Sequence, residues 1–143
     1  MSRIVQRVGF GALLLLSSIL FIPSTAPAQT AGTKPIYRIE FKPGARATIV
    51  EGTVTQPAGE GDMHNSGSER YTLRVRGGQT LRLEITSDNN EALFSLSTPD
   101  FEIVDAAAGV KRFYGKLRFS GDYYITVFAR KSASRFKLKV TLR

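Results

Sequence analysis

The chain has 143 residues, with 20 Lys and Arg against 12 Asp and Glu for a net charge of +8, and it contains no cysteine and one histidine, His64. The absence of cysteine excludes a disulfide scaffold, a cysteine-ligated zinc site and a thiol nucleophile. Hydrophobic residues make up 42% of the chain and charged residues 22%, which is typical of a folded single domain and not of a disordered chain.

The N-terminus has the layout of an export signal. Two arginines precede an apolar run over residues 8–22, and the small-residue pattern Ala26-Pro27-Ala28 follows it. The run, about 15 residues long, is shorter than the roughly 20 that a helix needs to cross a bilayer. We therefore expect residues 1–28 to be a cleaved signal peptide and residues 29–143 to form one domain. The mature protein is then periplasmic or secreted and has no transmembrane segment.

The first half of the mature chain alternates apolar and polar residues, as strands with one buried face do. The pattern predicts strands over residues 37–41 and 48–54, separated by a turn at Pro43-Gly44. Residues 55–68 contain three glycines and show no periodicity. We expect a long loop there, because small polar residues and glycine favour loops over regular elements.

Two further strands are predicted over residues 71–75 and 81–85, on either side of Gly77-Gly78. Glycine pairs supply the positive φ angles that tight hairpin connections require, so the sequence predicts that these two strands form a hairpin. Residues 88–91 predict another turn, and a strand over residues 92–97 follows.

The stretch from 99 to 109 is ambiguous: Asp100 could cap a helical turn that runs into three alanines, or the whole stretch is a loop. After it, alternation predicts three last strands, over residues 113–117, 123–127 and 136–142. About eight short strands with regular turns and no clear helix predict an all-β fold, an antiparallel β-sandwich. Aromatic residues in such strands are expected to fill the core between the sheets.

Catalytic chemistry has little support in the sequence. His64, with Glu60 and Asp62 nearby, lies in the predicted glycine-rich loop, where a histidine is more often solvated than catalytic. The chain has no phosphate-binding glycine loop and no nucleophile elbow. We therefore predict that the protein is not an enzyme and has no catalytic residue, cofactor or metal site.

Positive charge is concentrated near the C-terminus: residues 111–143 contain ten basic residues and one acid, Asp122. If these residues share a face, they would attract an anionic partner; alternatively, they simply occupy water-facing strand positions. Arginines beside aromatics, as in Arg112-Phe113-Tyr114, are also found on nucleic-acid stacking surfaces. The predicted export argues against nucleic acid as the partner.

Three stretches together resemble the bacterial periplasmic inhibitors of g-type (goose-type) lysozyme. They are residues 71–81 (YTLRVRGGQTL), residues 87–94 (SDNNEALF), and residues 113–127 with their Ser120-Gly121-Asp122-Tyr123 turn. The resemblance covers most of residues 36–143, and it implies a β-sandwich, a signal peptide and a g-type lysozyme as partner. The chain is more loosely similar to the bacterial pre-peptidase C-terminal domain, an accessory binding module.

The resemblance also implies a site. The strand after the Ser-Gly-x-Tyr turn leads, in the inhibitors, into a basic loop with two arginines four residues apart that enters the lysozyme cleft. Counting from Ser120 places these positions at Lys131 and Arg135, and a shift of one residue places the first at Arg130. Arg135 already begins the last predicted strand, so this loop is several residues shorter than in the family.

We therefore expect Arg130, Lys131 and Arg135, at a hairpin between the last two strands, to contact the partner. A guanidinium can form bidentate, charge-assisted hydrogen bonds with carboxylates in a glycosidase cleft. Two alternatives stay open. The protein could be a non-enzymatic envelope module that binds anionic glycans or lipid headgroups, or the basic hairpin could only protect a sheet edge from aggregation.

Overall fold

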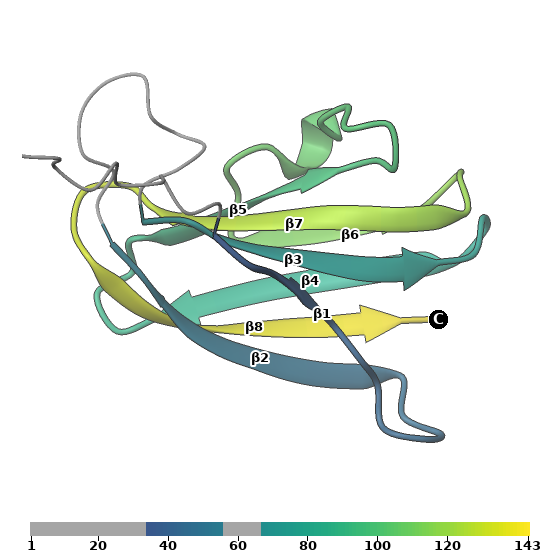
Figure 1. Cartoon of the computed structure of the whole chain (residues 1–143), viewed down its shortest axis with the longest axis horizontal. Helices are drawn as coiled ribbons and strands as arrows, with labels where there is room; N and C mark the ends of the chain where they lie inside the picture. The colour runs from purple at the N-terminus through teal and green to yellow at the C-terminus, as the bar shows by residue number, and fades with distance from the viewer. Residues whose placement is uncertain (1–33, 56–66) are drawn as a thin grey trace, which may run out of the picture. The chain divides into compact units, whose positions relative to one another are not determined.

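The computed structural model describes residues 34–55 and 67–143, which form two four-stranded sheets (Figure 1). Sheet A has the strand order β1 (Ile36–Arg38), β3 (Glu69–Val75), β7 (Gly121–Ala129) and β5 (Ala92–Ser97). Sheet B has the order β2 (Ala47–Val54), β8 (Ser134–Leu142), β4 (Thr80–Ser87) and β6 (Arg112–Lys116). The predicted all-β sandwich of eight strands is confirmed. The predicted signal peptide and His64 lie outside the described residues.

Strands that follow one another in the chain always lie in different sheets: odd-numbered strands form sheet A and even-numbered strands form sheet B. The hairpin predicted at Gly77-Gly78 is therefore wrong, because β3 belongs to sheet A and β4 to sheet B. Gly78 does have the positive φ expected of a tight turn, 92°. Its N–H donates to the carbonyl of Leu117 at 2.7 Å. Because β3 and β4 lie in different sheets, this turn carries the chain across the sandwich.

The hairpin expected around Arg130–Arg135 is wrong for the same reason. Strand β7 pairs with β3 and β5 in sheet A, whereas β8 pairs with β2 and β4 in sheet B. The loop thus joins two inner strands and protects no sheet edge. The alternative interpretation as an edge-protecting hairpin does not fit this topology.

The core lies between the sheets and is made by alternate residues of each strand. Phe136, Leu138 and Val140 of β8 are buried, while the residues between them are exposed. Tyr71 and Tyr123 are 4% and 1% exposed, which confirms that these aromatics fill the core. Burying a large apolar side chain contributes about 1.5–3 kcal/mol, so this alternation fixes which face of each strand turns inward.

The ambiguous stretch after β5 runs beside that strand. Isolated bridges pair Ser97 with Ile103 and Phe94 with Val110. Between them lies a short 3-10 helix, η1 (Asp105–Ala107), whose N-cap is Val104 and not Asp100. No helix within the described residues is long and apolar enough to span a membrane.

Candidate functional site

The loop between β7 and β8 consists of four residues, Arg130 to Ala133. Arg130 and Lys131 are exposed in this loop. Arg135 is the second residue of β8 and is exposed on the outer face of sheet B. The structure therefore places two of the three predicted site residues in the loop and the third on the strand that leaves it.

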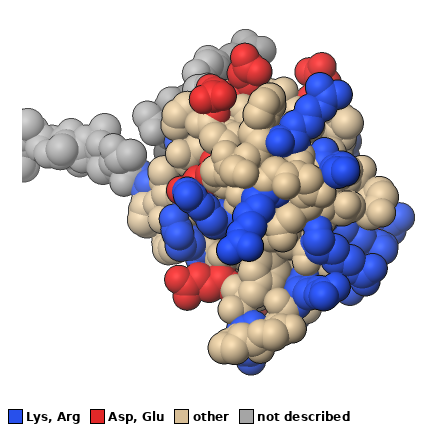
Figure 2. Space-filling model, turned by 90° about the vertical axis from the view of Figure 1, so that its right-hand side faces the viewer, with Lys and Arg blue, Asp and Glu red and all other residues tan. Residues whose placement is uncertain are grey.

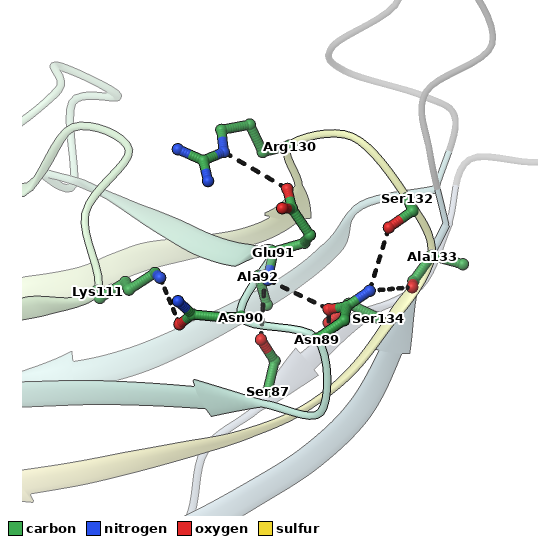
Figure 3. Close-up of polar contacts among 10 residues, drawn as sticks. All are labelled: Ser87, Asn89, Asn90, Glu91, Ala92, Lys111, Arg130, Ser132, Ala133 and Ser134. Atoms are coloured by element: carbon green, nitrogen blue, oxygen red, sulfur yellow. Dashed lines mark hydrogen bonds and ion pairs between the residues drawn. The ribbon is translucent and has the colours of Figure 1, made fainter.

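The turn between β4 and β5 holds this loop in place (Figure 3). Asn89 Nδ2 donates to Ser132 Oγ at 3.1 Å and to the Ala133 carbonyl at 2.8 Å. Ser134 Oγ donates to Asn89 Oδ1 at 2.6 Å. One amide side chain thus contacts three consecutive residues of the loop and strand, using both its donor and its acceptor.

Arg130 has an acidic neighbour that is distant in sequence. Its Nε lies 3.4 Å from Glu91 Oε2, and its backbone N–H donates to the Glu91 carbonyl at 3.0 Å (Figure 3). Asp122 is the acid nearest to Arg130 in the sequence, whereas the fold brings Glu91 beside it. An exposed ion pair of this kind adds little stability, but it orients the guanidinium.

Lys131 and Arg135, unlike Arg130, have no acidic side chain paired with their charge in the described part of the chain. Asp88 contacts Arg135 through the backbone, with its Oδ1 accepting from the Arg135 N–H at 3.3 Å and its own N–H donating to the Arg135 carbonyl at 3.2 Å. Within residues 34–55 and 67–143, neither Lys131 nor Arg135 forms a side-chain ion pair. Both charges therefore face solvent and are available to a partner.

The strand-borne cations share one surface, the outer face of sheet B. Of the ten basic residues between positions 111 and 143, five point outward from β6 and β8: Arg112, Lys116, Arg135, Lys137 and Lys139. Arg82 of β4 joins them. Figure 2 shows Lys and Arg side chains gathered towards its lower right. The sequence alone does not decide whether basic residues share a face, and the structure places these six on one face of sheet B.

Two acids on the same face offset part of this charge. Glu84 lies 2.9 Å from Arg82 and 4.0 Å from Arg112, and Glu51 lies 2.8 Å from Lys137. The hydrogen bond from Arg82, with the nearby positive charges, lowers the pKa of Glu84. The hydrogen bond to Glu51 raises the pKa of Lys137. The six cations of this face outnumber its two acids, so the face carries a net positive charge at neutral pH.

Sequence reasoning did not name this face as a candidate site. The available signal was the spacing of two residues in Arg112-x-Tyr114-x-Lys116 and Arg135-x-Lys137-x-Lys139, which puts each set on one side of a strand. In the part of the chain that the structure describes, no group of three His, Cys, Asp or Glu residues could hold a metal ion. The loop histidine lies outside that part.

Comparisons with family models and with curated protein sequences gave no match. Among solved structures, the periplasmic inhibitor of g-type lysozyme PliG from Aeromonas hydrophila is similar, with a TM-score of 0.61 and 22% identity over 76% of this chain and 96% of that one. PliG from Salmonella Typhimurium has a TM-score of 0.58 and 17% identity over 78% and 100% of the two chains. The two proteins and this chain share one fold.

The pre-peptidase C-terminal domain of Bacillus anthracis collagenase is also similar, with a TM-score of 0.51 and 16% identity over 76% of this chain and 96% of that one. Both families expected from the sequence motifs therefore have the fold of this chain. Identities of 22% and below establish that fold alone. The site must be argued from the residues of this protein.

Proposed function

We propose that the protein is a non-enzymatic, periplasmic inhibitor of g-type lysozyme that inserts its β7–β8 loop into the acidic cleft of the enzyme. The observation that carries the proposal is the anchored basic loop. Arg130 and Lys131 project from a four-residue connection that Asn89 and Glu91 hold in place, and Arg135 lies beside it. The fold shared with solved lysozyme inhibitors supports it.

The physical basis is complementary charge. A glycosidase cleft carries carboxylates, and an arginine can bind such a group through two parallel hydrogen bonds. Arg130 would exchange the half-buried Glu91 for a carboxylate in the cleft of the enzyme. Because the loop is already held by side-chain hydrogen bonds, little conformational freedom is lost on binding. The exposed charges of Lys131 and Arg135 accelerate encounter with the acidic cleft.

The test is inhibition of a g-type lysozyme by the wild-type protein and by the double variant Arg130→Ala/Arg135→Ala. We expect the double variant to lose inhibition, since removing one partner of a desolvated charge pair costs about 2–5 kcal/mol of binding. Its melting temperature should barely change, because exposed surface positions contribute less than roughly 0.5 kcal/mol to folding.

A charge-matched control is Arg76→Ala/Arg118→Ala. Both residues are exposed and lie near the start of β7, at the opposite end of the strand from the loop. This control should inhibit like the wild type. Equal inhibition by all three proteins would place the contact elsewhere, and absence of inhibition by the wild type would reject the proposed function.

A further inference from the structure

A second surface lies on the outer face of sheet B, away from the β7–β8 loop. Its centre is Tyr114 of the edge strand β6, which at 77% is the most exposed large hydrophobic residue in the described part of the chain. In register, Tyr114 lies opposite Arg82, and Arg82 lies opposite Thr141 of β8. Thr141 lies six positions beyond Arg135 along β8, a length of about 20 Å. The end of this face around Tyr114 is thus separated from the end at Arg135, where the β7–β8 loop lies.

Two shallow hollows flank the tyrosine. One, of about 280 Å³, is lined by Tyr114 and by Thr80, Arg82, Lys139, Thr141 and Arg143. The other, of about 530 Å³, is lined by Tyr114 and by Arg82, Leu83, Glu84, Arg112, Phe113 and Arg143. Tyr114, Arg82 and Arg143 belong to both. An exposed aromatic ring therefore stands between two hollows that are lined by arginine residues.

The charges around the ring are arranged for a bound anion. Glu84 contacts both Arg82 and Arg112, so one carboxylate orients two guanidinium groups and neutralises only one of them. Lys139 and Arg143 form no ion pair within residues 34–55 and 67–143. Thr80 and Thr141 add hydroxyl groups that can donate and accept hydrogen bonds.

We propose that this surface binds a chain of acidic sugars. The Tyr114 ring packs against the apolar face of a sugar ring, the threonine hydroxyls bind sugar hydroxyls, and the cations in the two hollows bind carboxylates on neighbouring sugars. An exposed aromatic residue with convergent polar groups suits a ligand that has an apolar face, hydroxyl groups and negative charge. A partner recognised by charge alone would make no favourable contact with the Tyr114 ring.

The test uses isothermal titration calorimetry of the protein with three probes: hexagalacturonate, neutral maltohexaose and hexametaphosphate. We expect hexagalacturonate to bind best, with an affinity that falls as salt rises. Maltohexaose lacks the charges and hexametaphosphate lacks the sugar rings, so both should bind more weakly. Equal binding of hexametaphosphate, or no binding of hexagalacturonate, would overturn the proposal.

Single substitutions distinguish the contribution of the Tyr114 ring to binding from the contribution of the cations. Tyr114→Ala should weaken hexagalacturonate binding about tenfold, the equivalent of one good aromatic contact, and leave hexametaphosphate binding unchanged. Tyr114→Phe should retain the affinity. Lys139→Ala should weaken the binding of both anions, whereas Arg74→Ala, an exposed cation on the outer face of sheet A, should weaken the binding of neither. Because these side chains are exposed, thermal unfolding should show intact folding.

Lysozyme inhibition assays test whether the sugar-binding surface and the proposed inhibitor loop act independently. Tyr114→Ala should inhibit g-type lysozyme as the wild type does, if the wild type inhibits at all. Loss of inhibition by Tyr114→Ala without any binding of hexagalacturonate would show that the surface contacts a protein, and would overturn the sugar proposal.

Discussion

Asn89 Nδ2 donates a hydrogen bond of 2.8 Å to the carbonyl oxygen of Ala133, which connects the turn after β4 to the loop before β8. The two residues are 44 positions apart in the chain. Through this contact a polar turn residue fixes the backbone of the short loop from which Arg130 and Lys131 project. Loop position and loop charge can therefore be tested separately.

Asn89→Ala should weaken lysozyme inhibition even though every cation remains. The variant loses the hydrogen bonds to Ser132, Ala133 and Ser134, and we expect it to lower the free energy of unfolding by about 1–3 kcal/mol. Denaturant unfolding and inhibition assays measure the two effects. The control is Lys111→Ala, which removes the 2.5 Å contact with Asn90 in the same turn and should leave inhibition intact. Equal inhibition by both variants would contradict a positioning role for Asn89.

Glu91→Gln should strengthen inhibition. The substitution keeps a hydrogen-bond acceptor beside Arg130 but removes the negative charge that competes with a carboxylate of the partner. We expect the association rate to rise, because electrostatic complementarity acts mainly on that rate, and the gain to shrink at high salt. Surface plasmon resonance at two salt concentrations measures it. Weaker inhibition by the variant would mean that the Glu91 charge is needed to hold Arg130 in place.

Gly52→Ala should destabilise the fold. A Cβ placed on Gly52 would lie 2.8 Å from Cζ of the Phe136 ring and would also collide with the Glu69 carboxylate. Forcing an extra methyl group into a packed site costs about 1–3 kcal/mol, whereas Thr53→Ala at the exposed neighbouring position should cost much less. Urea unfolding of the two variants provides the comparison. Wild-type stability of Gly52→Ala would show that Phe136 can move aside at no cost.

Stability should decline in alkaline solution because of Tyr71. Burial, and then the hydrogen bond that its hydroxyl donates to Glu69, raise the pKa of Tyr71 well above its usual value. A folded-state pKa above the unfolded value of about 10 gives stability that is complete below that pH and is lost as pH rises beyond it. Tyr71→Phe should flatten this decline above about pH 10. An unchanged slope, measured by urea unfolding at several pH values, would exclude Tyr71 as its source.

Local sequence patterns determined most strands of this protein and the faces they bury; the exception is the strand predicted over residues 37–41, where β1 covers only Ile36–Arg38 and is exposed throughout. The predicted strand over residues 92–97 coincides with β5, and the alternation over residues 136–142 matches the buried and exposed positions of β8. The reason is physical: successive side chains of a strand point to opposite sides, so a strand's own residues reveal its inner face. The motifs at the turns were specific enough to indicate the correct fold.

Only the tertiary structure decided which strands pair and which charges meet. A glycine turn looks the same whether the chain folds back on its sheet or crosses to the other one, and at Gly78 it crosses. The crossing follows from closing two apolar faces on each other, a contact between residues far apart in sequence. The same packing brings Glu91 to Arg130 and aligns Arg82 beside Tyr114. The candidate surfaces depend on these distant pairings, which no local pattern encodes.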